Sequence, residues 1–320
     1  MLTTRDLAAQ AAQTDAVTVT TVKKQTAHWK NYLLFLHDIE LGTHPFLTNL
    51  EPWVQHQILG AFAAAYRAGR FSPTHNPADG AAVGSKTVRA TIDAVAAIFR
   101  AKYHSSPIHD PITTRLVFIL QRQLKGYTNQ DPAEKPQKAI TPRILRALIA
   151  VRTTTLDEAI SQLAVGAFFY AMRSCEYSKV SKSTERRTKL LVICNSRFFR
   201  SWRERPHSDP ALHLADSVSI TFEFQKNDER DATITMHRTG DATLCPVISW
   251  SSIVRRIRAI PGTSHRSPVC TYLRADGTPG LVTSKQILDR IRDRVTAIGK
   301  DVLGFEAWEV STHSIRSAAT

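Results

Sequence analysis

The sequence is poor in cysteine and has no long apolar run. Its four cysteines (Cys175, Cys194, Cys245 and Cys270) are widely spaced, and none belongs to a Cys-x-x-Cys pair. This spacing argues against a zinc ribbon and against a disulfide-stabilised scaffold, so we expect reduced, mostly buried thiols. The start of the chain lacks a hydrophobic signal region, and no run of roughly 18 apolar residues, the length of a membrane-spanning helix, follows it. These absences predict a soluble intracellular chain.

Acidic residues are also in the minority. The chain has 28 Asp and Glu against 42 Lys and Arg, which gives a formal net charge of +14. The excess is +5 over residues 1–138, with 15 basic against 10 acidic residues, and +9 over residues 139–320, with 27 against 18. Because neither terminus holds a block of like charge, this distribution favours a polyanion that is contacted by two lobes. Basicity alone is also typical of proteins that bind RNA, the ribosome or anionic lipid.

Apolar residues make up 42% of the 320 residues, which is enough for two domains with hydrophobic cores. Helical spacing of apolar residues predicts four helices near the start of the chain, over residues 18–41, 51–68, 85–103 and 111–127. The fourth helix is expected to begin behind Asp110 as its N-cap, with Pro111 at its first position. We predict a helical domain over residues 1–127 and a linker over residues 128–139, where prolines and charges interrupt the apolar pattern.

Residues 140–320 are predicted to combine helices with a small sheet. Helical patterns cover residues 141–149, 156–177, 248–260 and 283–298, and a last helix is expected to begin at Ser311 or Thr312. Alternating patterns predict antiparallel strands over residues 190–194, 218–224 and 232–237, with Lys226 in the hairpin turn between the last two. The Arg-rich stretch 195–216 is expected to be an irregular surface segment. The expected fold class is therefore mainly α with a small antiparallel sheet, an α+β fold.

Arg173 stands out because it follows directly on an apolar helical run, GAFFYAM. A buried guanidinium without a partner costs several kcal/mol, so a cation at such a place needs an anion. Glu176, three residues further on, is placed to orient Arg173 and also to neutralise it. The alternative is a surface arginine at a helix end with an intrahelical Glu partner.

The order of motifs resembles that of the tyrosine recombinase, or phage-integrase-like, family, and more closely its divergent members in eukaryotic mobile elements. The first box of that family is matched by FYAMRSCEYSKV with Arg173 and Glu176, and its hairpin lysine by Lys226. The second box, His-x-x-Arg behind a Ser or Thr cap, is matched by THSIRSAAT with His313 and Arg316. The match covers about residues 139–320, and the helical first domain stands where the family has its core-binding domain. A His-x-x-Arg motif alone carries no weight, so the combination is what matters.

The resemblance implies metal-independent breakage and rejoining of DNA strands, without a cofactor. Arg173 and Arg316 would neutralise the non-bridging phosphate oxygens, and Lys226 would protonate the leaving 5′ oxygen. His313 would assist proton transfer or brace the phosphate. Lys179 or Lys182 could take the role of Lys226, which could instead be a solubilising hairpin residue. His313 could merely cap its helix.

The resemblance also implies partners. Double-stranded DNA is expected, with self-association on it as a synaptic tetramer, in the nucleus of a eukaryote and otherwise in the cytoplasm or nucleoid. In the first domain, Lys86, Arg89, Arg100 and Lys102 are candidate phosphate contacts because they cluster on one predicted helix, although such residues also mark a solvated face. No metal is expected, because His207 and His213 lack a nearby third ligand.

The sequence departs from the family at the nucleophile. The family's tyrosine lies some tens of residues beyond the second box, whereas all seven tyrosines of this sequence precede His313. We therefore interpret the sequence as a fragment or as a degenerate relative, and expect DNA binding without a covalent 3′-phosphotyrosyl intermediate. The alternatives are a non-catalytic DNA-binding protein derived from a mobile element and a basic helical scaffold for protein partners.

Overall fold

A computed structural model describes residues 17, 19–71, 82–133, 137–179, 188–225 and 229–318. The chain divides into two compact units, Met1–Glu134 and Lys135–Thr320. The division falls inside the predicted linker, residues 128–139. None of the helices in the described part of the chain is long and apolar enough to cross a membrane.

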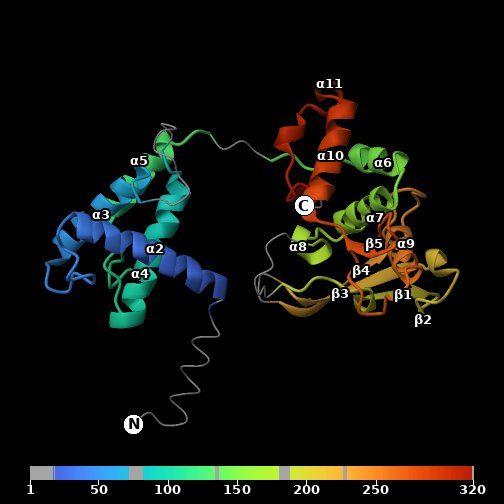
Figure 1. The fold of residues 1–320 in the computed structure, drawn as a ribbon, viewed down its shortest axis with the longest axis horizontal. Coiled ribbons are helices and arrows are strands. Elements are labelled where there is room, and N and C mark those ends of the chain that lie inside the picture. The colour runs from blue at the N-terminus through green and yellow to red at the C-terminus, as the bar shows by residue number, and fades with distance from the viewer. Residues whose placement is uncertain are drawn as a thin grey trace, which may run out of the picture. The chain divides into compact units, whose positions relative to one another are not determined.

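The described residues of the N-terminal unit form a bundle of four helices (Figure 1). They are α2 (Val19–Asp38), α3 (Pro52–Arg67), α4 (Ser85–Tyr103) and α5 (Phe118–Gln130). Helix α4 contacts the other three, and aromatic side chains fill the space between them. Tyr32 is 5.3 Å from Phe62 and 6.2 Å from Phe99, measured between ring centroids. The predicted bundle is thus present, with α5 ending three residues inside the segment that we assigned to the linker.

The predicted start of the fourth helix was wrong. Asp110 does accept backbone N–H groups, from Ile112 and Thr113, but these bonds close a tight turn and do not start a helix. The chain instead makes a short hairpin in which His109 pairs with Leu116, and α5 begins at Phe118. An Asp followed by Pro serves a turn as well as a helix N-terminus, so the residues alone did not distinguish the two.

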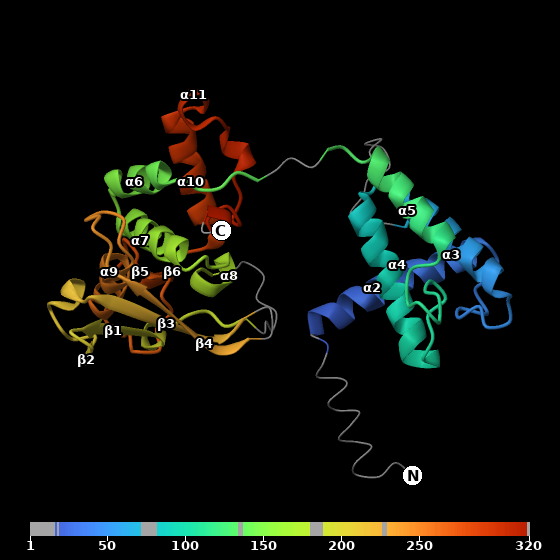
Figure 2. The same ribbon diagram turned by 180° about the vertical axis from the view of Figure 1, so that it is seen from behind.

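Over its described ranges, the C-terminal unit contains four longer helices and a four-stranded antiparallel sheet of strand order β2-β1-β3-β4 (Figure 2). The helices are α6 (Pro142–Ala150), α7 (Thr155–Phe169), α9 (Pro246–Arg258) and α10 (Ser284–Ile298). The strands are β1 (Ser196–Arg200), β2 (Arg203–Arg205), β3 (Ser217–Phe224) and β4 (Arg230–His237), and a separate hairpin joins β5 (Thr271–Leu273) to β6 (Pro279–Leu281). The shorter helices are α8 (Ser174–Tyr177), α11 (Lys300–Leu303) and the 3₁₀ turns η2 (Ile193–Asn195), η3 (Leu212–Leu214), η4 (Ala307–Glu309) and η5 (Arg316–Ala318). The predicted fold class, mainly α with a small antiparallel sheet, is confirmed.

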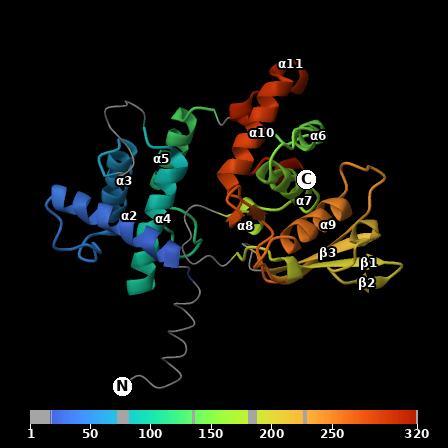
Figure 3. The same ribbon diagram turned by 45° about the vertical axis from the view of Figure 1, so that its right-hand side comes forward.

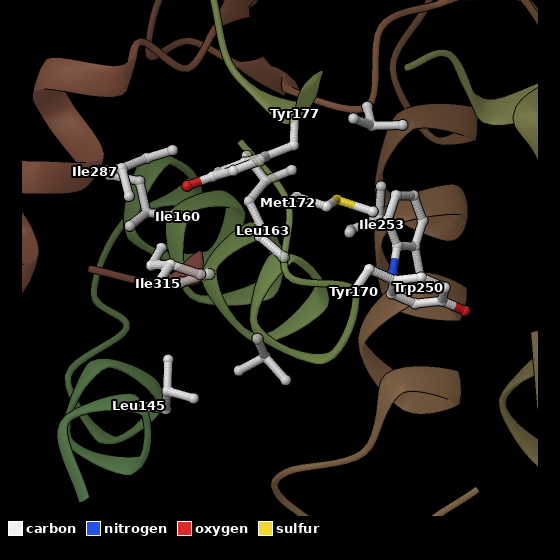
Figure 4. Packing of buried hydrophobic residues seen from close by; sticks show 14 of the residues in the cluster. Leu145, Ile160, Leu163, Tyr170, Met172, Tyr177, Trp250, Ile253, Ile287 and Ile315 are labelled. Carbon is white, nitrogen blue, oxygen red and sulfur yellow. The ribbon is translucent and has the colours of Figure 1, made fainter. Parts of the chain in front are cut away.

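Helix α7 lies at the centre of this unit. Every residue from 159 to 167 is buried, which requires that neighbours cover the helix on all sides. Helix α9 covers one side, where Trp250 packs edge-on against Tyr170 (Figure 4). A Cβ atom on Gly166 would lie 3.1 Å from the Trp250 Nε1 atom, so glycine allows the close approach of α7 and α9.

Two expectations for the sheet were wrong. Residues 190–194 do not form a strand, because the Val192 N–H donates to the Asn195 side chain and the chain turns into η2. The stretch 195–216, expected to be irregular, contains β1 and β2. Phe198 of β1 is fully buried and anchors that strand to the core, while Arg197 and Arg200 are exposed.

Candidate functional site

Arg173 is placed by the way in which α7 ends. The Met172 N–H donates to the Ala167 carbonyl at 3.0 Å, and the Ala171 N–H donates to the Phe168 carbonyl at 3.3 Å. These two bonds form a Schellman motif, which requires a left-handed residue, and Ala171 has φ 48°. The single helix predicted over residues 156–177 was therefore wrong. Ala171 hid the break, because this position is usually glycine.

After the break, Arg173 becomes the N-cap residue of the four-residue helix α8, and Glu176 binds it twice. The Arg173 backbone N–H donates to Glu176 Oε2 at 2.7 Å, and the Arg173 Nη1 atom lies 3.3 Å from Glu176 Oε1. The Glu176 side chain is 4% exposed, whereas the Arg173 side chain keeps 19% exposure. The bond to the backbone N–H is the shorter of the two, so Glu176 interacts more strongly with the Arg173 backbone than with its guanidinium.

His313 and Arg316 follow a segment that is tied to residues 137–140. Ser311 Oγ donates to the Gln137 side chain at 2.6 Å and also accepts the His313 N–H at 3.1 Å. The Ile140 N–H donates to the Ser314 carbonyl at 3.1 Å. His313 is exposed and Arg316 is half-buried.

The last predicted α-helix is not present in the described residues, where the chain forms turns and a 3₁₀ helix. Residues 312–315 form turns, and a 3₁₀ helix, η5, covers Arg316–Ala318. Ser311 Oγ accepts the His313 N–H, but no helix begins directly behind Ser311 or Thr312 in the described part of the chain, so neither residue is the expected helix N-cap.

The two arginines of the candidate site each follow a residue of the same hydrophobic core. Met172 and Ile315 are both 1% exposed and belong to the cluster that surrounds α7. Figure 4 shows Ile315 beside Ile160 on one side of α7 and Met172 at the α9 side. η5 itself packs against α7. Arg173 and Arg316 therefore each follow a core residue that packs near α7, although they lie far apart in the sequence.

The candidate general acids are only partly described. Lys226 and Lys182 lie outside the described residues. Lys179 is exposed, and its backbone is fixed beside the start of α10, since its N–H donates to Val282 and its carbonyl accepts from Ser284. This bridge holds the segment that follows α8 against the N-terminus of α10.

The tyrosines nearest to Arg173 in the sequence are core residues. Tyr170 is buried and its hydroxyl donates to the Val218 carbonyl at 2.6 Å. Tyr177 is 1% exposed, and burial raises the pKa of both phenols far above the ordinary value. Neither hydroxyl is accessible to attack a phosphodiester.

The candidate phosphate contacts of the N-terminal unit divide between two faces of α4. At about 100° per residue, Lys86, Arg89 and Arg100 fall within about 60° of one another, whereas Lys102 lies on a different side. Arg89 pairs with Asp93 at 2.8 Å, one turn further along the same face. The pKa of nearby His109 is lowered by partial burial and then by the Arg100 cation. This face of α4 is thus cationic, with one carboxylate in it.

One buried cation was not anticipated from the sequence. Arg256 of α9 donates through Nη2 to the Val269 carbonyl at 2.9 Å, while its Nε and Nη1 atoms are buried without a hydrogen-bond partner among the described residues. Burial lowers its pKa to about 10. The pattern of residues 248–260 predicted a helix, but periodicity does not show which of its cations a later loop covers.

The two histidines that we considered as metal ligands, His207 and His213, differ in their surroundings. The His207 Nε2–H donates to the Ser196 carbonyl at 2.8 Å, and His213 is exposed in η3. No protein-family model and no curated protein sequence matches the chain.

Proposed function

We propose that this chain is a DNA-binding protein of the tyrosine-recombinase type, in which Arg173 and Arg316 bind one backbone phosphate. The observation that carries the proposal is the placement of both arginines directly after core residues, Met172 and Ile315, that pack around α7. A rigid attachment matters because a guanidinium binds a phosphate through two parallel N–H groups and needs a fixed orientation. Two such groups would neutralise the negative charge on the non-bridging oxygens as the phosphorus becomes five-coordinate during strand transfer.

The charge of the C-terminal unit supports this proposal. Residues 135–320 contain 29 Lys and Arg against 18 Asp and Glu, a net charge of +11, whereas residues 1–134 contain 13 against 10. A unit of this size with such an excess attracts a polyanion over several Å. The Lys86, Arg89 and Arg100 face of α4 would add phosphate contacts from the N-terminal unit.

Salt dependence of DNA binding tests the proposal. Fluorescence anisotropy with a labelled duplex should show that log K falls by about 0.9 for each phosphate contact per log unit of salt. Arg173→Ala and Arg316→Ala should each weaken binding and reduce this slope by up to about one contact. Arg146→Ala is the matched control, because Arg146 is an exposed arginine of the same unit that pairs with Asp241 at 2.6 Å. Unchanged slopes in both site variants would contradict the proposal.

A second candidate, a non-catalytic DNA-binding protein, is favoured by the Arg173–Glu176 pair and by the burial of Tyr170 and Tyr177. Orthovanadate distinguishes the two, because it adopts the five-coordinate geometry of the reacting phosphorus and a catalytic site binds that geometry more tightly than the ground state. A recombinase-type site should bind DNA that lacks one backbone phosphate at least about 10-fold more tightly with vanadate than with phosphate. A binding protein should show no difference between the two anions.

A further inference from the structure

The turn between β1 and β2 exposes an aromatic side chain almost completely. Arg200 pairs with Arg203 in the antiparallel register, so Ser201 and Trp202 form a two-residue hairpin turn. The Trp202 side chain is 96% exposed, more than that of any other large apolar residue that the structure describes. It belongs to the stretch 195–216, which the proposed function does not use.

The backbone of this turn is unfavourable for its residues. Ser201 and Trp202 both lie in the left-handed region, with φ 49° and 64°. Two-residue turns of this kind favour Asn-Gly, because glycine has no Cβ to clash and a bulky residue at positive φ is a rare exception. Asp216 fixes the turn, since its Oδ2 atom accepts the Ser201 N–H at 2.6 Å and its own N–H donates to the Phe199 carbonyl at 2.8 Å.

The turn also brings like charges together. Arg200 and Arg203 face each other across the two strands, and like charges at directly opposed positions destabilise a hairpin. Arg197 adds a third exposed cation on β1. Three carboxylates lie around the turn. Asp216 accepts the turn N–H, Asp209 pairs with Arg205 and also interacts electrostatically with Arg200, and Glu204 stands opposite Phe199.

We infer that this turn binds DNA at an unpaired base, with Trp202 stacked on the base and Arg200 and Arg203 on the flanking phosphates. The inference rests on the proposed function for the identity of the polymer. An anion relieves the repulsion of the two arginines, and a flat aromatic partner covers the exposed indole. A nucleotide whose base is out of the helical stack offers both, whereas an intact duplex hides the faces of its bases.

This contact is separate from the Arg173 site. Phe199 of β1 pairs with Ser217, so the turn lies beside the start of β3, at the end of the strand opposite to the β3–β4 hairpin. The eight residues of β3 span about 25 Å at roughly 3.3 Å per residue. Figures 1, 2 and 3 show β1 and β2 on the side of the C-terminal unit away from α8. The turn would therefore bind DNA at a distance from the phosphate that Arg173 contacts.

Binding of two DNAs by Trp202 variants tests the inference. The probes are a labelled duplex and the same duplex with a gap of a few unpaired nucleotides, measured by anisotropy with the full chain. Trp202→Ala should lose about 5- to 100-fold in affinity for the gapped DNA, the range for loss of one stacked base, and less than about 2-fold for the intact duplex. Trp202→Phe should keep most of the affinity because it keeps a ring. Trp53→Ala, which removes a 61% exposed tryptophan of α3, is the matched control and should change neither affinity.

Three other outcomes would contradict the inference. Salt-dependent duplex binding with equal affinities of wild type and Trp202→Ala for the gapped DNA would overturn the inference and leave the proposed function standing. Wild-type protein that binds neither DNA would overturn both. Loss of binding of Trp202→Ala to phosphatidylserine vesicles, with gapped-DNA affinity unchanged, would assign the turn to an anionic lipid surface and contradict the base contact.

Discussion

At the scale of single residues, Glu176 decides how much of the Arg173 charge is available. Its carboxylate accepts the Arg173 backbone N–H at 2.7 Å and lies 3.3 Å from the Arg173 guanidinium. The first contact is part of the fold and the second opposes anion binding. The two contacts can be separated by a glutamine at position 176. Its amide oxygen can still accept the Arg173 backbone N–H, but the neutral side chain cannot act as a counter-ion for the guanidinium.

Glu176→Gln should therefore strengthen DNA binding while preserving stability. The glutamine Oε1 atom can still accept the Arg173 N–H, so we expect the free energy of unfolding in urea to change by less than about 1 kcal/mol. DNA affinity should rise several-fold, since the guanidinium loses its internal counter-ion. Glu176→Ala is the control: it removes the cap as well and should cost about 0.5–2 kcal/mol of stability. Weaker DNA binding by Glu176→Gln, with stability intact, would show that the carboxylate is needed to orient Arg173.

The spacing of Arg173 and Glu176 was predictable from the sequence, but the local structure between them was not. Two residues that face each other on a helix surface can be three positions apart, and an N-cap residue and its N3 partner are also three positions apart. The decisive difference is the left-handed Ala171, where the sequence shows an ordinary helix-forming residue. The convergence of Met172 and Ile315 on one core depends on long-range packing that no local pattern encodes.

At the scale of secondary-structure elements, the end of α7 is held against the preference of its residue. Ala171 has φ 48°, a conformation that costs an L-residue about 1 kcal/mol and costs glycine almost nothing. Ala171→Gly should therefore stabilise the chain by about 0.5–1 kcal/mol in urea denaturation. Ala167→Gly, one turn earlier in the buried helix, is the control and should destabilise it by about 1 kcal/mol or more. Destabilisation by both changes would contradict the Schellman geometry.

The β1–β2 turn gives a similar test with a functional cost. Replacing Ser201-Trp202 by Asn-Gly supplies the residues that a two-residue turn favours, so we expect a stabilisation of about 1 kcal/mol in thermal or urea unfolding. The same change removes the exposed indole and should reduce affinity for gapped DNA. A less stable hairpin would mean that Trp202 has packing that its 96% exposure does not show.

The helices were easier to predict than the strands. Apolar residues at helical spacing identified α2, α3, α4 and α10, and the Thr283–Gln286 capping box is present at the start of α10. Strand β1 was missed because its two exposed arginines and two phenylalanines do not alternate cleanly. The turn after it was missed because Ser-Trp lacks the Asn-Gly chemistry on which hairpin prediction depends.

At the scale of the whole molecule, a partly buried ion pair, Arg67–Asp131, joins helices of the N-terminal unit. In the N-terminal unit, Arg67 of α3 donates to Asp131 and to the Val83 carbonyl, and Asp131 Oδ2 accepts the N–H of Ser85 at the start of α4. This network joins α3 and α4 to the end of α5. Arg67 and Asp131 are 10% and 22% exposed, so removal of Arg67 leaves a carboxylate with only part of its compensation. Arg67→Ala should therefore destabilise the protein, which would appear as a lower midpoint in urea denaturation.

The same network predicts a dependence on pH. The hydrogen bonds from Ser85 and Arg67 lower the pKa of Asp131 to about 2 from its ordinary value of 3.8. A carboxyl whose pKa is lower in the folded state stabilises that state above pH 4, and this stabilisation is lost as the pH falls from 4 towards 2. Urea denaturation at several pH values should therefore show a smaller loss of stability below pH 4 for Asp131→Asn than for wild type. Equal slopes would contradict the assignment.

The most direct test of the proposed function is a double-mutant cycle on Arg173 and Arg316, measured as DNA affinity at one salt concentration. If both guanidiniums bind one phosphate, the loss in Arg173→Ala/Arg316→Ala should be smaller than the sum of the single losses by about 1 kcal/mol, because either change alone already releases the phosphate. The control pair, Arg173→Ala with Arg100→Ala of the N-terminal unit, should be additive within about 0.5 kcal/mol. Additive losses for Arg173 and Arg316, or no loss from one of them, would contradict a shared phosphate.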